Sequence, residues 1–154
     1  MNPETLPTNI QFQHVLPLFL FMVMGAMVLL SIVSGWRGLA SRFPSVAVGE
    51  GQRFRFVSAK MGRVRWFPVN YGGSMILTVT PQGLAISTYM PFRFFFPAFF
   101  LPWAQVERVE VRASALARRT VVHIRGSSTW ISFRGIPGQS VLDTYERVRS
   151  ESAS

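Results

Sequence analysis

The longest uninterrupted run of apolar residues lies near the N-terminus. Residues 15–34 read VLPLFLFMVMGAMVLLSIVS and contain no charged side chain. About twenty helical residues at about 1.5 Å each span about 30 Å, the thickness of the hydrocarbon core of a bilayer. No face of this segment carries the polar stripe that a half-buried helix of a soluble domain shows to water. The pattern therefore predicts a single transmembrane helix over residues 15–36.

A cleaved signal peptide is the main alternative for this segment. Such a peptide has a basic leading region, a shorter apolar core and a cleavage site of small residues. The leading stretch MNPETLPTNIQFQ carries no basic side chain, and apolar residues continue to Val33. These differences favour an uncleaved anchor, with residues 1–14 as a short tail outside the cytoplasm.

Charged residues are distributed unevenly about the apolar run. All 16 basic residues follow it, beginning with Arg37, and the chain carries a formal net charge of +9. By the positive-inside rule, the N-terminus lies outside and the C-terminal domain lies in the cytoplasm. The chain holds no cysteine, so neither a disulfide nor a thiolate metal site can form.

Small residues interrupt the large apolar side chains in the middle of the predicted helix. Gly25 and Ala26 permit the close approach of a neighbouring helix, as small residues do in membrane proteins. No full GxxxG motif is present, so a helix surrounded only by lipid is an equally good interpretation. Helix packing at Gly25 and Ala26 therefore stays one of two open alternatives.

The pattern predicts a juxtamembrane segment and linker over residues 37–52. Trp36 lies where an interfacial aromatic anchor belongs, and Arg37 beside it is placed to meet headgroup phosphates. Phe43 is expected to lie along the membrane surface before Pro44 ends any helix. We therefore predict that Trp36, Arg37 and Phe43 contact the membrane interface.

From Arg53 onward, apolar and polar residues alternate with a period of two, which is typical of β-strands with one buried face. Lys60, Met61 and Gly62 predict a turn between the first two strands. Seven strands are predicted in all, over residues 53–57, 63–67, 74–80, 83–89, 103–111, 120–126 and 129–135.

The end of the chain has a helical pattern instead. Val141, Tyr145 and Val148 recur at helical spacing, and Asp143 lies in the first turns, where its charge suits the helix dipole. About seven short strands followed by one amphipathic helix indicate a pleckstrin-homology-like sandwich or barrel over residues 53–154, with the helix closing one open end. The predicted fold class is thus a single transmembrane helix plus a mainly-β domain that ends in one α-helix.

Several motifs, in this order, resemble a family of small bacterial single-pass membrane proteins. They are SGWRGLASRFP directly after the apolar run, then RFRFVSAKMG, LTVTPQGLAIS and FLPWAQVERVEV. The family pattern is GWxxLAxx[FY]P, followed by a glycine-leucine strand and an IPW-type strand start, and the resemblance covers most of residues 34–111. It implies a pleckstrin-homology-like domain and a place in the bacterial inner membrane, but no particular activity. The run MPFRFFFPAFFLPW is more aromatic than the family pattern.

This aromatic run, residues 90–103, is the first candidate for a functional surface. Its three prolines argue against a continuous helix or central strand, so we expect a loop with a short strand inside. An exposed apolar patch of this size is an association site, so something must cover it: the domain's own core, the lipid interface or another protein. The residues concerned are Phe92, Phe94, Phe95, Phe96, Phe99, Phe100 and Trp103.

The arginine-bearing strands are the second candidate. Arg53 and Arg55 share one strand face, as do Arg63 and Arg65. If the two strands pair, these guanidinium groups and Lys60 form one patch able to bind phosphate or carboxylate groups. The spacing is similar to the basic cluster with which eukaryotic pleckstrin-homology domains bind phosphoinositides. The alternatives are a merely solvated face and attraction to anionic lipid, at about 1 kcal/mol per basic residue near the surface.

Residues suited to catalysis or cofactor binding are sparse. His14 and His123 are isolated, and the sequence contains no HExxH, GxSxG, P-loop or GxGxxG motif. Glu107 and Glu110 lie beside two arginines on a predicted strand, which indicates surface ion pairs. We therefore expect no enzymatic activity, no metal and no cofactor. The pI near 11.6 would suit nucleic-acid binding, but no recognition helix or base-stacking motif accompanies it.

Two functions fit these observations. The first is a non-enzymatic accessory or scaffolding subunit that docks on a larger integral membrane complex through its transmembrane helix, aromatic run and basic face. The alternative is a membrane-tethered module that binds or senses anionic lipid. The expected partners are membrane lipids and other integral membrane subunits, and neither nucleic acid nor a small-molecule substrate is expected.

Overall fold

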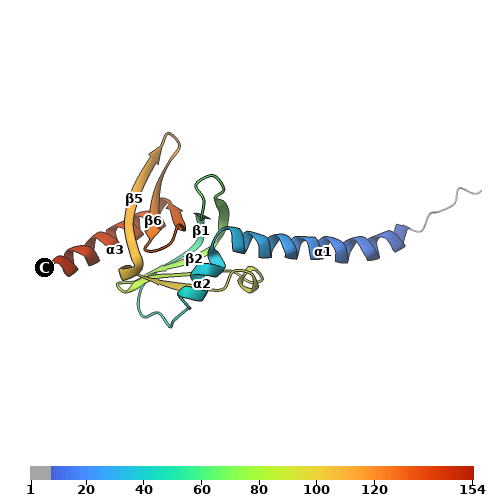
Figure 1. The fold of residues 1–154 in the computed structure, drawn as a ribbon, viewed down its shortest axis with the longest axis horizontal. Coiled ribbons are helices and arrows are strands. Elements are labelled where there is room, and N and C mark those ends of the chain that lie inside the picture. Colours follow the sequence, from blue (N-terminus) through green and yellow to red (C-terminus); the bar gives the residue numbers. More distant parts are fainter. Residues whose placement is uncertain (1–7) are drawn as a thin grey trace, which may run out of the picture.

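The computed structural model describes residues 8–154, with side chains from residue 13 onward. Two helices, α1 (Thr8–Val33) and α2 (Trp36–Arg42), precede a sheet domain that ends in helix α3 (Gly135–Ala153) (Figure 1). Of the predicted tail, residues 1–7 lie outside the described residues, and the rest belongs to α1. The strands are β1 (Gln52–Gly62), β2 (Val69–Val79), β3 (Gly83–Thr88), β4 (Phe99–Pro102), β5 (Val106–Ser114), β6 (Ala117–Ile124) and β7 (Trp130–Arg134).

Helix α1 extends away from the domain as a long rod (Figure 1). Its segment Gln13–Val33 is long and apolar enough to cross a membrane, and few of its residues are buried. Large apolar side chains such as Leu18 and Phe21 point outward with nothing over them. An exposed apolar rod of this length is suited to membrane anchoring.

The domain is built on one curled antiparallel sheet with the strand order β4-β3-β2-β1-β7-β6-β5. The central strand β1 pairs with β2 on one side and with β7 on the other. Helix α3 packs against β6 and β7 and buries Val141 in the core. This architecture confirms the predicted mainly-β domain, with its N-terminal apolar helix and its C-terminal helix.

Strand β1 runs without a break through the residues that were predicted to form a turn. Met61 and Gly62 are buried, and Gly62 still pairs with Trp130 of β7. The turn prediction was wrong because pairing with a strand far along the chain outweighs the weak local glycine signal. Instead β1 bends at Phe56, which has a φ of 54°. This conformation is uncommon for residues other than glycine.

The remaining elements differ from the prediction mainly at their ends. Residues 63–68, which were predicted as a strand, form the loop between β1 and β2. A short strand, β4, does lie inside the aromatic run, and one 3₁₀ turn (Trp103–Gln105) separates it from β5. Helix α3 begins at Gly135, the last residue of the predicted strand 129–135, and contains Pro137 near its start, where a missing amide hydrogen costs little.

Candidate functional site

The junction between α1 and the sheet domain is built round Trp36. This side chain is fully buried, and its indole Nε1 donates a hydrogen bond to the carbonyl oxygen of Pro97 at 2.8 Å. Its ring lies against Tyr71, Phe96 and Phe99, at centroid distances of 5.2, 5.5 and 5.2 Å. The sequence predicts Trp36 at the membrane interface, but the structure places it in the core. The correction has a physical cause, because rings from distant parts of the chain enclose the indole.

The two residues before Trp36 complete the junction. Ser34 is fully buried, and its Oγ accepts a hydrogen bond from the hydroxyl of Tyr71 at 2.8 Å. Burial raises the pKa of Tyr71 to about 12. Gly35 has a φ of 82°, and a Cβ there would lie 2.7 Å from the side chain of Arg63, so only glycine fits the turn. A packed turn, and not a flexible linker, therefore joins α1 to the domain.

Helix α2 continues this packing over the end of the sheet next to β4. Leu39 and Phe43 are buried in the core, and the carbonyl oxygen of Phe43 accepts a hydrogen bond from the amide of Phe100 at 3.1 Å. Phe43 therefore belongs to the core and not to the membrane surface. Of the three residues that were predicted at the membrane interface, only Arg37 is exposed.

Most of the aromatic run is covered by the domain itself. Phe96, Phe99, Leu101 and Trp103 are buried, and Phe95 and Phe100 are half-buried. These side chains fill the core because β4 alternates between its two faces and α2 lies over it. The exposed remainder consists of Phe92 and Phe94 in the turn before β4.

Apart from Phe56 of β1, which stacks on Tyr89, the most exposed aromatic side chains of the domain lie on two loops. We call them the junction loops: residues 63–68 between β1 and β2, and residues 89–98 between β3 and β4. On the first, Trp66 is 84% exposed and Phe67 is 75% exposed. On the second, Phe94 is 73% exposed. Each junction loop therefore presents at least one large aromatic group to its surroundings.

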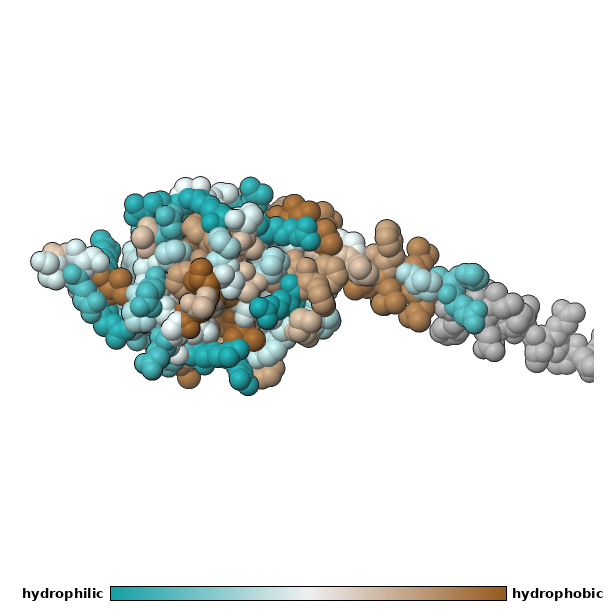
Figure 2. All heavy atoms as spheres, turned by 90° about the horizontal axis from the view of Figure 1, so that it is seen from below, coloured by the Kyte–Doolittle hydropathy of each residue, from teal (hydrophilic) through white to brown (hydrophobic). Residues whose placement is uncertain are grey.

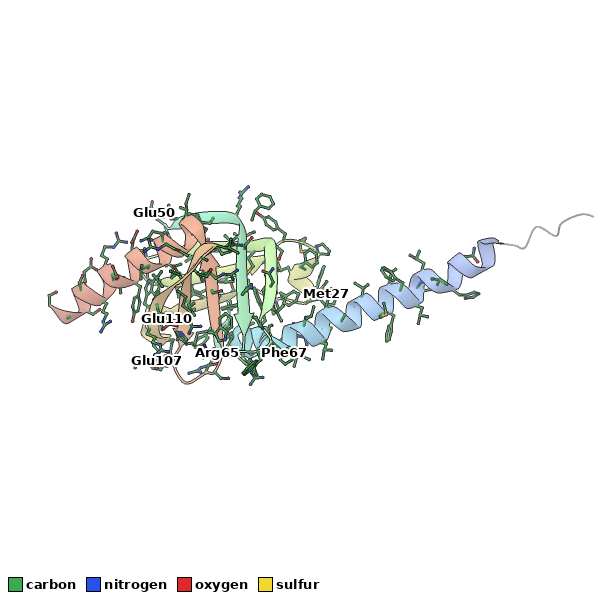
Figure 3. The ribbon with its side chains drawn as sticks, turned by 90° about the horizontal axis from the view of Figure 1, so that it is seen from above. Met27, Glu50, Arg65, Phe67, Glu107 and Glu110 are labelled. Atoms are coloured by element: carbon green, nitrogen blue, oxygen red, sulfur yellow. The ribbon has the colours of Figure 1, made fainter. Side chains whose placement is uncertain are left out.

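Both junction loops lie beside the C-terminal end of α1. A small cavity between α1 and the domain is lined by Met27 and Leu30 of α1 and by Phe92 of the second loop. Figure 3 shows Arg65 and Phe67 of the first loop next to the base of α1, and Met27 a short way along the helix. In Figure 2, the apolar surface of α1 continues onto the adjoining end of the domain.

The predicted arginine patch is divided between the two ends of β1. Arg53 and Arg55 lie in its first half, whereas Arg63 and Arg65 lie in the first junction loop beyond its last residue. A single patch is not formed, because residues 63–67 do not pair with residues 53–57. Lys60 is half-buried on the strand between the two groups.

Glu110 of β5 takes part in every ion pair found among residues 13–154. Arg112 lies 2.5 Å from its carboxylate, and Arg108 lies 3.9 Å away. The Nε2 of His123 lies 3.0 Å from the same carboxylate. The hydrogen bonds with His123 and Arg112 hold the pKa of Glu110 below its ordinary value. The predicted ion pairs are thus confirmed for Glu110, while the Glu107 carboxylate takes part in none of those found in this part of the chain.

The small residues of α1 face outward. Gly25 and Ala26 are exposed, and no atom lies within 4 Å of a Cβ built at Gly25. Packing of another helix on this face therefore stays a prediction. His14, at the start of the apolar segment, is exposed as well.

Sequence reasoning missed the exposed pair Trp66 and Phe67. The alternation in RVRWF indicates a strand, which would bury one of the two rings. Two features pointed the other way: adjacent aromatic residues cannot share one strand face, and Pro68 directly after them cannot donate a ladder hydrogen bond. An exposed loop satisfies both conditions.

No family model and no curated protein sequence matches this chain. Among solved structures, the chain is similar to the one described as the Vps36 N-terminal PH domain. The TM-score is 0.48 at 9% sequence identity, over 67% of this chain and 80% of that chain. This likeness says nothing of what the present chain binds.

Proposed function

We propose that this protein is a non-enzymatic, membrane-tethered module whose pleckstrin-homology-like domain is held against the lipid surface by α1 and the junction loops. The observation that carries the proposal is that Trp66, Phe67 and Phe94 are exposed on the junction loops, which lie beside an apolar helix suited to cross a membrane. Tryptophan is enriched at membrane interfaces, and phenylalanine inserts its ring there. Lipid is therefore the cover that these exposed rings require.

The position of the domain along α1 sets the depth of the junction loops. The apolar segment extends to Val33, but the domain already meets α1 at Met27 and Leu30. At about 1.5 Å per residue, Met27 lies about 9 Å before Val33 along the helix axis. When the apolar segment lies across a bilayer, side chains beside Met27 reach the boundary between headgroups and acyl chains.

The packed junction adds to this argument. A domain on a flexible linker can move away from the surface, whereas the buried Trp36 and the hydrogen bond from Tyr71 to Ser34 hold α1 in one position relative to the sheet. Membrane insertion of α1 therefore carries the junction loops to the interface at little further cost in conformational entropy.

The charges favour the same orientation. The acidic residues Glu50, Glu107 and Glu110 lie away from α1 (Figure 3). Arginines near a membrane surface attract anionic lipid by about 1 kcal/mol each. We infer that the domain lies on the cytoplasmic side of a bacterial inner membrane, where such lipids face it. The arginines of the junction loops are Arg63, Arg65 and Arg93.

The test uses the full chain in bilayers that contain a phospholipid with a nitroxide at a shallow acyl position. Trp66 lies at the interface in this proposal, so the nitroxide should quench a component of the tryptophan emission that Trp66→Phe removes. Trp103→Phe is the matched control, because Trp103 is buried beside Tyr145 of α3, away from the junction loops. Equal quenching of the wild type and of Trp66→Phe would overturn the proposal.

A second candidate is the accessory subunit of a larger membrane complex. The observation that favours it is the open face of α1 at Gly25 and Ala26, where a neighbouring helix could approach closely. Purification from native membranes in mild detergent tests it. A stoichiometric integral membrane partner that is lost with Gly25→Leu would support this role, and a monomer free of such partners would count against it.

A further inference from the structure

A groove opens on the domain where the sheet is incomplete. Strand β7 stops at Arg134, because Gly135 has a φ of 66° and starts α3. The neighbouring strands β1 and β6 continue past this point, so a groove of about 750 Å³ opens between them. The first residues of α3, including Ile136, form its third wall. The size is within the range of small-molecule sites.

Three arginines from three different strands line this groove. Arg55 comes from β1, Arg118 from β6 and Arg134 from the end of β7, and Ser58 adds a hydroxyl group. All three arginines are exposed, and no aspartate or glutamate is among the residues that line the groove. The convergence is not visible in the sequence, because the three residues lie far apart along the chain.

A row of arginines on the neighbouring strands adds positive charge beside the groove. Arg112, Arg119 and Arg134 lie directly opposite one another on the adjacent strands β5, β6 and β7. Like charges at directly opposite positions destabilise a sheet. Glu110 offsets only Arg112, since the ion pairs among residues 13–154 leave Arg119 and Arg134 without a carboxylate. Of this row only Arg134 lines the groove, and an anion bound there would relieve its repulsion with Arg119.

We propose that this groove is a binding site for phosphate groups, held by Arg55, Arg118 and Arg134. A guanidinium group presents paired N–H donors that match two oxygens of a phosphate, and several such groups can surround one ligand. The site does not depend on the proposed function, because its residues lie outside the junction loops. The phosphate belongs either to a free phosphorylated compound or to a lipid headgroup, and the two sources can be distinguished.

The test is titration calorimetry on the full chain in a non-ionic detergent and a phosphate-free buffer. One arm uses inorganic pyrophosphate as the probe, and the other uses dihexanoyl phosphatidic acid, a short-chain soluble lipid. Saturable binding of pyrophosphate assigns the groove to free phosphate groups. Saturable binding of the lipid alone assigns it to headgroups. Saturable binding of neither probe overturns the proposal.

Matched variants show whether the binding belongs to this groove. The double variant Arg118→Ala with Arg134→Ala should weaken binding at least about tenfold. The control Arg147→Ala with Arg149→Ala removes the same charge from the far end of α3 and should change the affinity less than about twofold. An equal loss of affinity in both double variants would mean that binding depends only on the net charge of the protein, and it would contradict a binding site in this groove.

A conservative double variant tests the same site in case the alanine double variant does not fold. Arg118→Lys with Arg134→Lys keeps the charge but lacks the guanidinium fork, so it should bind several-fold more weakly while its circular dichroism spectrum stays that of the wild type. Wild-type affinity in this pair would contradict recognition by the guanidinium groups. This result can be read even if the alanine variant does not fold.

Discussion

Replacing Trp36 tests the packed junction, because the sequence and the structure assign this side chain opposite environments. At a membrane interface, Trp36→Ala would leave the sheet domain intact. In the structure, the indole is fully buried, donates to the Pro97 carbonyl and contacts three aromatic rings. Its removal should therefore unfold the domain at a lower temperature.

The expected effect of Trp36→Ala is large. Truncation of a buried tryptophan costs about 3–5 kcal/mol of the free energy of unfolding, and the Pro97 carbonyl also loses its hydrogen-bond donor. For a domain of this size, each kcal/mol shifts the melting temperature by about 4 °C. We therefore expect the melting temperature to fall by about 15 °C. Trp36→Phe keeps a ring but not the donor, and its effect should be less than half as large.

Near-ultraviolet circular dichroism of the full chain in detergent measures this transition. Trp66→Ala is the control, because it removes the same kind of side chain from an exposed loop. Surface substitutions of this kind change stability by about 0.5 kcal/mol or less. If Trp36→Ala lowers the melting temperature no more than Trp66→Ala does, Trp36 is not buried in a packed junction between α1 and the sheet domain.

Three further variants address other contacts. Gly83→Ala would place its Cβ in a steric clash with the carbonyl oxygen of Leu101, so the melting temperature should fall by an amount equivalent to about 2 kcal/mol or more. Tyr71→Phe should lower the free energy of unfolding by about 1 kcal/mol, because the hydrogen bond to Ser34 is lost. Guanidinium chloride denaturation at neutral pH measures this change. Because the folded pKa of Tyr71 is raised to about 12, wild-type stability should decline above about pH 10, and the variant should lack this decline. Because the folded pKa of Glu110 is lowered, its contribution should be present above about pH 4.3 and be lost on further acidification, and Glu110→Gln should lack this loss in acid unfolding curves.

Features with a local signal could be predicted from the sequence. The uncharged run belongs to α1 over residues 15–33, and the spacing of Val141, Tyr145 and Val148 predicts the packed face of α3. Alternation with a period of two predicts the β class of the domain, since burial of one sheet face requires it. In these elements, the hydrophobic pattern itself carries the structural information.

Features that depend on distant partners could not be predicted. Trp36 and Phe43 are residue types typical of an interfacial segment. In the structure, the rings of Tyr71 and Phe99 lie against Trp36, and Phe43 is buried in the same core. The groove lined by Arg55, Arg118 and Arg134 also depends on distant partners, because it opens only where β7 ends between β1 and β6. Local alternation also cannot distinguish a paired strand from an exposed loop, which is why the position of Trp66 was missed.

The most direct test of the proposed membrane contact is the depth of one spin label. The chain contains no cysteine, so Phe67→Cys allows a single nitroxide to be attached in the first junction loop. Leu116→Cys is the control, since Leu116 is 94% exposed on the hairpin between β5 and β6, which lies farther from α1 than β1 and β2 do (Figure 1). In full-length protein in bilayers, the label at position 67 should be accessible to oxygen and shielded from a water-soluble nickel complex. If both labels are equally accessible to nickel, the domain does not rest on the membrane surface.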